Sequence, residues 1–342
     1  MVLLLTDSDV VQAVSPPTAV RRCIDLVERC FEDVARGEAC VAPRLELLYP
    51  PTARQHAEAK LSLHASWGIL PSLNAIGGRI FTTDAAQREN DPAIHCFWKL
   101  LFDFASMNLV CLMEDRSLHP YVVGAHVGVA TRWLAREDAT SVGVLGSSRM
   151  AKGSLRAICA VRAITRAQVY SPNPEHRRAF ARDAAASFGI EVTAVDSAEA
   201  AVREVDVVTC ATNIFNVRDA PGVYSAQWLS PGTHVNTITR YEPDAASFRR
   251  AKIIPASLRG ALEIMPPWEP FKSLLDRGAI PPENLPGDLV EIVAGQRPGR
   301  TSAEDVTLYL GVGLGVLQPA VAAWVYEAAR EQGLGLHWQL DP

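Results

Sequence analysis

The sequence predicts an α/β protein in which a doubly wound domain with a parallel sheet is inserted into a mixed α+β domain. Residues 141–174 show the pattern of a strand, a tight turn, an amphipathic helix and a second strand. After them helical and strand-like segments alternate, as a parallel sheet requires. Residues 306–333 are apolar and end in a long helical run, which we expect to return to the N-terminal half.

The turn after the first of these strands has most features of a phosphate-binding turn. Gly146 and Ala151 occupy the first and third small positions of the pattern G-x-G-x-x-G/A, and Ser148 replaces the middle glycine. Serine is small, and its hydroxyl can hydrogen-bond a phosphate oxygen. The turn therefore predicts a Rossmann dinucleotide-binding domain, with an ordinary strand-to-helix crossover as the alternative.

The N-terminal half combines one amphipathic helix with several short strands. Apolar residues recur at helical spacing from Val20 to Val34, after a helix start at residues 15–17 and before Gly37. The segments that follow are predicted strands at 41–48, 60–67 and 75–82, a hairpin-like pair at 96–104 and 109–113, and a helix at 121–136. These strands suggest a sheet separate from the first βαβ unit.

The second half alternates regularly. Predicted helices cover 174–188 and 197–202, and predicted strands cover 191–194, 206–211, 233–238 and 252–255. We expect residues 119–311 to form the dinucleotide-binding domain. Residues 1–118 and 312–342 would together form the second domain.

The composition argues against several classes of function. Of the 342 residues 48% are hydrophobic and 21% charged, and the net charge is −5, so no basic face for nucleic acid is expected. The N-terminus is too short and too soon acidic for a signal peptide, and no apolar run reaches membrane-spanning length, which predicts a cytoplasmic protein without a membrane partner. The seven cysteines are scattered, which predicts buried free thiols and no metal site.

Five short motifs occur in an order found in one known family. They are Leu101-Phe102-Asp103, Gly146 with Ala151, DVVTCAT at 206–212, GTHVN at 232–236 and EIVAGQRPGRT at 291–301. With them the chain resembles the ornithine cyclodeaminase and mu-crystallin family over nearly its whole length. The resemblance implies a nicotinamide cofactor, a small-molecule substrate, hydride transfer at the α-carbon of an amino or imino acid, and a homodimer that pairs through the composite domain.

The same resemblance implies candidate substrate residues. Arg44, after Pro43, matches an arginine that forks onto a substrate carboxylate. Arg79 stands where the family has its active-site lysine, so the positive charge is kept while an acid–base role is lost. The second carboxylate arginine of the family is replaced by Val122, and His126 on the same helix could restore part of the lost polarity.

The loop after Asn236 predicts the direction of the reaction. Tyr241 matches the position of the family's catalytic aspartate, and a shift in register would place Glu242 or Asp244 there. A tyrosine, with a pKa of about 10, is protonated at neutral pH and suited to donating a proton. We therefore predict reduction of a C=N or C=O bond, with Tyr241 as the candidate donor.

Each of these residues also has a structural interpretation. Arg44 and Arg79 lie among apolar neighbours, where Glu46 or Asp84 could pair with them in structural salt bridges. Tyr241 could be a packing residue of its loop. The sequence leaves both interpretations open.

The end of the second strand of the βαβ unit favours NADP(H) over NAD. An NAD site needs an acidic residue there, whereas this chain has neutral and basic residues that suit a 2′-phosphate. The alternative is that the arginines there face solvent. The predicted cofactor-binding residues are Gly146, Ser147, Ser148, Arg149, Met150, Ser171, Asn173, Arg177, Thr209, Ala211, Thr212 and Thr237.

Three functions fit the sequence. The first, which we predict, is an NADP(H)-dependent reductase or dehydrogenase acting on an imino or keto acid, with Arg44 and Arg79 orienting an acidic substrate. The second is an amino-acid cyclodeaminase with NAD and an altered site. The third is a non-catalytic NADPH-binding protein of the mu-crystallin type.

Overall fold

The computed structural model describes residues 1–15, 18–53, 58–86, 91, 93–212, 222–239, 242–264, 268–311 and 313–339. The chain forms two compact units. The composite unit comprises Met1–Val122 and Gly313–Pro342 with the short segment Glu263–Pro266, and the inserted unit comprises Val123–Leu262 and Pro267–Val312. Each unit is built around its own sheet.

The described part of the inserted unit contains a seven-stranded parallel sheet in the order β10-β9-β8-β11-β12-β14-β13. The strands are β8 (Ser141–Leu145), β9 (Arg166–Tyr170), β10 (Glu191–Ala194), β11 (Val207–Cys210), β12 (His234–Thr237), β13 (Lys252–Pro255) and β14 (Thr307–Leu310). The direction of winding reverses between β8 and β11, and doubly wound sheets bind ligands at such a switch point. The predicted fold class is confirmed.

Helices connect these strands, and their ends follow from local sequence. They are α3 (His119–Leu134), α4 (Arg149–Val161), α5 (Pro174–Phe188), α6 (Ala198–Val202), α7 (Ser247–Arg250), α8 (Leu258–Glu263), α9 (Phe271–Asp276) and α10 (Leu289–Val293). In α5, Asn173 caps the first turn, Pro174 takes the first helical position, and Gly189 ends the helix at φ +67°. The predicted bounds of α5, β10 and β13 are confirmed because such signals are local.

The composite unit contains a mixed sheet in the order β15-β1-β7-β6-β5-β4-β2, with β3 also paired to β4. Its strands are β1 (Val2–Leu5), β2 (Cys40–Val41), β3 (Leu45–Tyr49), β4 (Leu61–Leu70), β5 (Ala75–Asp84), β6 (Phe97–Asp103), β7 (Leu109–Glu114) and β15 (Leu336–Trp338). Its helices are α1 (Asp7–Ala13), α2 (Ala19–Ala35) and α11 (Leu317–Glu331). As expected, the C-terminal helix packs on the N-terminal strands.

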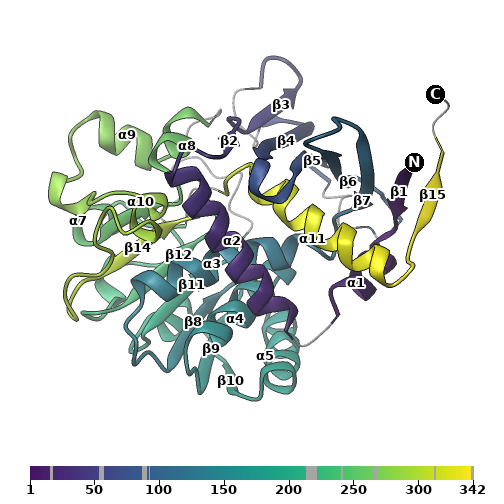
Figure 1. Cartoon of the computed structure of the whole chain (residues 1–342). Helices are drawn as coiled ribbons and strands as arrows, with labels where there is room; N and C mark the ends of the chain where they lie inside the picture. Colours follow the sequence, from purple (N-terminus) through teal and green to yellow (C-terminus); the bar gives the residue numbers. More distant parts are fainter. Residues whose placement is uncertain are drawn as a thin grey trace. The chain divides into compact units, whose positions relative to one another are not determined.

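The sequence did not predict β1, β14 or β15. The first and last strands of the chain lie side by side, with β15 antiparallel to β1 and β1 parallel to β7 (Figure 1). The strands β1 and β15 have only four and three residues, and each pairs with a segment more than a hundred residues away. Such short strands exist because of their distant partners, so the local pattern carries little signal for them.

Side chains alternate between the two faces of the composite sheet, and the faces differ. One face packs against α11, close enough that a Cβ on Gly315 would lie 2.1 Å from the carbonyl oxygen of Trp67. The other face is apolar and only half-buried, and it carries Ile76, Ile80, Trp98, Leu100, Phe102 and Leu112. At its edge the β3 side chains Leu47 and Tyr49 are 54% and 59% exposed.

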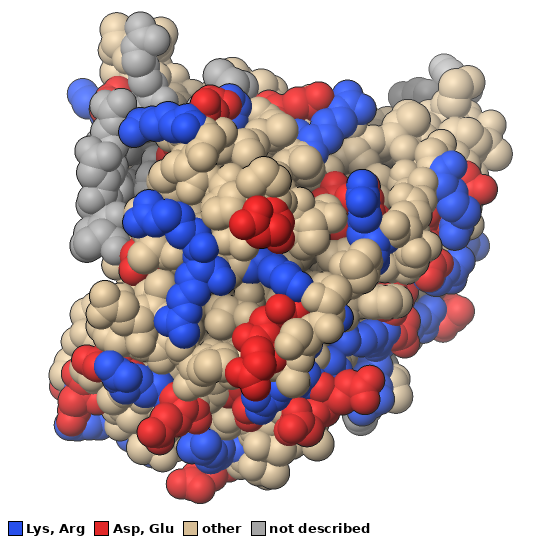
Figure 2. Space-filling view, turned by 90° about the vertical axis from the view of Figure 1, so that its left-hand side faces the viewer, with Lys and Arg blue, Asp and Glu red and all other residues tan. Residues whose placement is uncertain are grey.

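Positive and negative side chains are interspersed over the face of the molecule that Figure 2 shows. Within the described residues no helix combines the length and apolar character needed to cross a membrane. The same residues contain no cluster of three His, Cys, Asp or Glu side chains suited to a metal ion. The cysteines are all free; Cys40 is exposed rather than buried.

Candidate cofactor pocket and buried arginine clusters

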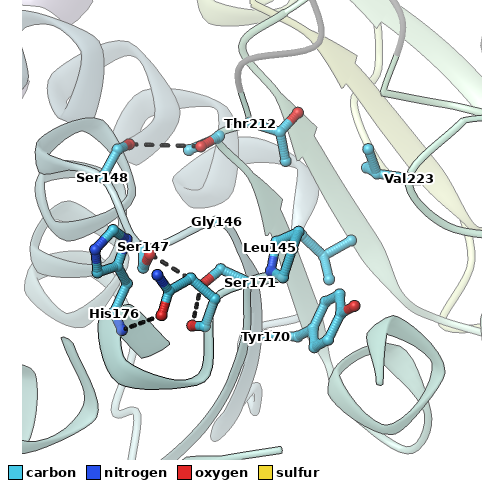
Figure 3. Close-up of a pocket in the computed structure, with 12 residues that line it drawn as sticks. Leu145, Gly146, Ser147, Ser148, Tyr170, Ser171, His176, Thr212 and Val223 are labelled. Atoms are coloured by element: carbon cyan, nitrogen blue, oxygen red, sulfur yellow. Dashed lines mark hydrogen bonds between the residues drawn. The ribbon is translucent and has the colours of Figure 1, made fainter. Parts of the chain in front are cut away.

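The inserted unit contains a pocket of about 640 Å³ where β8, β9 and β11 end (Figure 3). Ser147, Ser171 and His176 lie together at one end, and Thr212 and Val223 lie at the other. The described residues that line it are Leu145, Gly146, Ser147, Ser148, Tyr170, Ser171, Pro172, Asn173, His176, Ala211, Thr212 and Val223. The pocket thus occupies the switch point of the sheet.

The turn after β8 requires glycine at its first position. Gly146 has a φ of +110°, and a Cβ there would lie 2.3 Å from the carbonyl oxygen of Ala211. Ser148 then caps α4, with its hydroxyl accepting the backbone N–H of Ala151 at 3.3 Å. The N-terminus of α4 carries a partial positive charge, so these residues fit the phosphates of a dinucleotide.

The end of β9 is organised differently from the prediction. Ser147 Oγ donates to Ser171 Oγ at 3.0 Å, and both residues line the pocket. Arg177 does not line it, because its guanidinium donates to the Ser171 carbonyl at 3.1 Å and pairs with Asp196. Arg177 therefore supports the turn from behind, and its neighbour His176 lines the pocket instead.

Four further predicted cofactor residues lie outside the lining. Thr209 is fully buried in β11, and the hydroxyl of Thr237 donates to the Tyr309 carbonyl at 2.9 Å. Met150 packs against the hydrophobic core, and Arg149 stands beside it in the first turn of α4. Of the predicted set, Gly146, Ser147, Ser148, Ser171, Asn173, Ala211 and Thr212 line the pocket.

Glu242 has a structural role that the sequence did not indicate. Its carboxylate is fully buried and accepts the backbone N–H groups of Thr212, Ile238 and Thr239 at 2.8 to 3.0 Å, and the Thr212 hydroxyl at 3.0 Å. Burial raises the pKa of Glu242, although these donors oppose the shift. The side chain thus ties together the segments that follow β11 and β12.

The other two candidate residues of this loop are Asp244 and Tyr241. Asp244 accepts the backbone N–H groups of Ser247 and Ala226, so its carboxylate is also engaged within the fold. Tyr241 lies outside the described residues. The possible carboxylate substitutes that the sequence left open are therefore both bound by donors of the protein.

His126 lies in the core of the inserted unit. Its Nδ1 lies 3.2 Å from the Tyr309 hydroxyl, and burial lowers the pKa of the imidazole to about 4. The ring is therefore neutral at pH 7. It therefore offers a polar group without a positive charge on the helix where the sequence suggested that it restores part of the polarity lost at Val122.

In the composite unit, Arg79 belongs to a buried cluster of charged residues, the Arg79 cluster, with Lys99 and Asp115. The Nε–H of Arg79 donates to Asp115 Oδ2, and Lys99 Nζ lies 3.1 Å from Asp115 Oδ1. Lys99 Nζ also donates to Gln318 of α11. Burial lowers the pKa of Lys99 to about 8. The predicted partner Asp84 is thus replaced by Asp115.

Arg44 belongs to a second group, the Arg44 cluster, with Glu46, Ser62 and His64. Arg44 Nε lies 3.1 Å from Glu46 Oε1, so the expected pairing with Glu46 is present. His64 contacts Arg44 Nη2 through Nδ1 at 3.1 Å and Ser62 Oγ through Nε2 at 2.9 Å. The His64 ring stacks on Phe81 at 4.4 Å, and the Arg79 guanidinium lies 4.0 Å from the same ring.

The sequence analysis missed Lys99, Asp115 and His64, although one signal was present. In the strand Phe97–Asp103, period-two alternation places Lys99 on the same side as Phe97 and Leu101, facing the core. A lysine at such a position must have a partner. Asp115 follows the next strand, where no local pattern reveals the pairing.

Comparison of the chain with models of known protein families gives one match over nearly its whole length. The model of the ornithine cyclodeaminase/mu-crystallin family matches residues 6–333. The chain belongs to this family. The motif GTHVN is structural here, because His234 and Asn236 are fully buried and hydrogen-bond each other at 3.1 Å.

The family includes reductases and dehydrogenases of similar length. The Delta(1)-pyrroline-2-carboxylate reductase of Bacillus cereus is 30% identical over 278 residues, covering 78% of this chain and 82% of its own. The alanine dehydrogenase of Archaeoglobus fulgidus is 25% identical and is covered over 97% of both chains. The Thermococcus litoralis Delta(1)-pyrroline-2-carboxylate reductase, solved with NADH and L-proline, has 28% identity and a TM-score of 0.85 over 98% of this chain and 100% of that one.

Proposed function

We propose that the protein is an NAD(P)H-dependent reductase of the C=N bond of a small imino acid. The observation that carries this proposal is the full-length similarity to the Thermococcus litoralis reductase solved with NADH and L-proline. In such a reaction a hydride adds to the carbon and a proton to the nitrogen, so the C=N bond becomes CH–NH. The composite unit would hold the substrate, and the inserted unit would hold the cofactor.

The residues of the pocket fit a nicotinamide dinucleotide. When bound, that cofactor supplies the hydride. The N-terminus of α4 with Ser147 and Ser148 would hold the phosphates, while Glu242 fixes Thr212 in the lining. Glycine at 146 keeps this turn in place, because a Cβ there would collide with the carbonyl oxygen of Ala211.

Within that class we favour NADPH over NADH. The described residues of the lining include neither Asp nor Glu, the residues that receive the ribose hydroxyls of NAD. Ser147, Ser171 and the exposed His176 would instead surround the 2′-phosphate, whereas Arg177 acts only through the backbone of Ser171. The Thermococcus litoralis protein was solved with NADH, so this preference would distinguish the present chain.

For the substrate, we propose that Arg79 binds the carboxylate and that Tyr241 donates the proton. Arg79 is held by Asp115 through Nε, which leaves its Nη edge suited to a carboxylate. The carboxylates of Glu242 and Asp244 already accept bonds from the protein, so neither is suited to act as the base of a cyclodeaminase. Reduction is therefore favoured over deamination.

We also propose a homodimer formed through the composite unit. Its sheet has a half-buried apolar face, with Leu47 and Tyr49 exposed at the edge. A second copy would remove that surface from water. Light scattering at micromolar concentration should give twice the chain mass of 37.1 kDa, and a monomer would contradict the proposal.

The activity is tested by following NADPH and NADH oxidation with Delta(1)-pyrroline-2-carboxylate. We expect oxidation of both cofactors, faster with NADPH, and L-proline as the product. In a parallel assay, L-ornithine with NAD should give no ammonia. Ammonia and proline from ornithine would overturn the reductive proposal, and binding of NADPH without turnover of any imino acid would indicate a mu-crystallin-like role.

A further inference from the structure

The Arg79 cluster contains two cationic side chains and one carboxylate, and all three are buried. The exposed fraction of the side chain is 6% for Arg79 and zero for Lys99 and Asp115. An excess of charge is costly away from water unless a counter-ion compensates it. An anion bound at this cluster would supply the missing negative charge.

We propose that Asp115 and Lys99 are positioning residues for Arg79, and that Lys99 keeps the cluster positively charged for the substrate carboxylate. The proposal rests on the function proposed above and deepens it. It assigns substrate affinity to a pair of residues that need not touch the substrate.

The fold brings the three residues together through strand pairing. Arg79 in β5 lies directly opposite Lys99 in β6, and both side chains lie on the face that α11 covers. Asp115 follows β7, where its backbone N–H donates to the Phe97 carbonyl at 3.0 Å. With its Nε bound to Asp115 and its guanidinium over Phe81, Arg79 has little freedom to turn.

The charge of Lys99 decides the charge of the whole cluster. When Lys99 is neutral, Asp115 and Arg79 form a neutral ion pair with little remaining attraction for an anion. When Lys99 is protonated, Asp115 is shared between two cations and the cluster carries one net positive charge. Lys99 therefore restores the positive charge that Asp115 would otherwise cancel.

Several groups face Lys99 from the surrounding elements. They are Arg79 of β5, Asp115 after β7, Cys23 of α2 and Gln318 of α11, and His119 at the start of α3 lies 4.0 Å from Asp115. Burial, the largest cause, lowers the pKa of Lys99 to about 8, Asp115 raises it and Arg79 lowers it. Cys23, whose own pKa is raised to about 12 by burial, stays neutral in this range.

Anion binding and the protonation of Lys99 favour each other. Below pH 8 Lys99 is protonated and the cluster binds an anion, and above pH 8 the proton is lost and the affinity falls. A bound carboxylate favours the protonated form, so binding near pH 8 should be accompanied by proton uptake.

The test is calorimetric titration of the full-length protein with pyrrole-2-carboxylate, a planar anion without a reducible C=N bond, between pH 6.5 and 9.5. For the wild type we expect the affinity to fall by up to about tenfold per pH unit above pH 8. Lys99→Met should bind at least about tenfold more weakly at pH 7 and lose the pH dependence. Lys99→Arg should bind like the wild type at pH 7 and keep its affinity at pH 9.5, because a guanidinium stays charged.

Equal affinity of Lys99→Met and wild type at pH 7 would overturn the proposal, as would a decline of Lys99→Arg that follows the wild type. NADPH binding and thermal unfolding check that each variant folds, and if Lys99→Met does not, the pH profile of Lys99→Arg decides alone. The titration needs no turnover. A failure of imino-acid reduction is thus distinguishable from a failure of this assignment.

Discussion

The candidate cofactor pocket of the inserted unit and the Arg79 cluster of the composite unit are built from opposite kinds of polar group. Among the described residues the pocket is lined by serine hydroxyls, an asparagine, a threonine, a tyrosine, a histidine, apolar side chains and backbone, and none of these residues is Lys, Arg, Asp or Glu. The cluster consists of three ionisable side chains buried together. Both are suited to anions, yet only one relies on side-chain charge.

The difference follows from the two kinds of secondary structure. The first N–H groups of a helix have no partner within the helix, and at the N-terminus of α4 they offer a site for a phosphate without any charged side chain. In the sheet around Arg79, the strands on either side take up the backbone groups. An anion there must be met by side chains, and their charges must be balanced by others.

The strongest test of this contrast is Arg79→Met. Removing the guanidinium leaves the substrate carboxylate without its cation, so kcat/KM for the imino acid should fall about 1000-fold. Arg44→Met tests the other predicted carboxylate ligand, whose side chain is 33% exposed and so more strongly screened by water. We expect a loss of about tenfold or less there. Equal losses in steady-state assays would show that the two clusters are equivalent.

The second test measures stability at low pH. In the inserted unit the buried imidazole of His126 is neutral at pH 7, whereas the Arg79 cluster of the composite unit buries charged side chains. The unfolded chain protonates His126 below pH 6.5, whereas the folded chain does so only below about pH 4. Protonation of His126 should therefore lower the stability by up to about 3 kcal/mol as the pH drops through this window. His234, whose pKa burial lowers to about 3, adds a contribution of its own. Chemical unfolding at several pH values should show a smaller fall in His126→Gln. The exposed His176→Gln should behave as wild type.

Glu242 departs from the contrast between the two units, because it is a buried carboxylate in the inserted unit, next to the pocket residue Thr212. In Glu242→Gln the amide can no longer accept all the N–H donors that the carboxylate holds. Cofactor Kd should rise about tenfold as Thr212 loses its support. Fluorescence titration with NADPH measures this, with the exposed Glu199→Gln as control. An unchanged Kd would mean that Thr212 is positioned without Glu242.

The smallest effects are expected in the neutral lining itself. Ser171→Asp would place a carboxylate where we propose the 2′-phosphate, so the NADPH to NADH affinity ratio should fall about tenfold. Arg177→Ala should change that ratio by no more than about threefold, because the arginine only supports the Ser171 carbonyl. A larger change in the affinity ratio for Arg177→Ala than for Ser171→Asp would indicate that Arg177 binds the 2′-phosphate.

The sequence by itself determined the fold class, the family and the tight turn after β8. These depend on signals between near neighbours, such as the positive φ of Gly146 and the caps at Ser148 and Asn173. It also indicated that Arg44 and Arg79 needed partners. It misplaced Arg177, because the direction of a helical side chain depends on which partners bind it, here the Ser171 carbonyl and the Asp196 carboxylate.

Only the tertiary structure decided the partners of the buried charges. Asp115 meets Arg79 and Lys99 because β5, β6 and β7 are neighbours in one sheet, and Gln318 reaches Lys99 from the other end of the chain. Glu242 acquires its role from segments after two parallel strands. Buried ionisable groups pair with residues far away in the sequence, whereas turns and caps depend on near neighbours. The turns and caps could therefore be predicted from the sequence, and the partners of the buried charges could not.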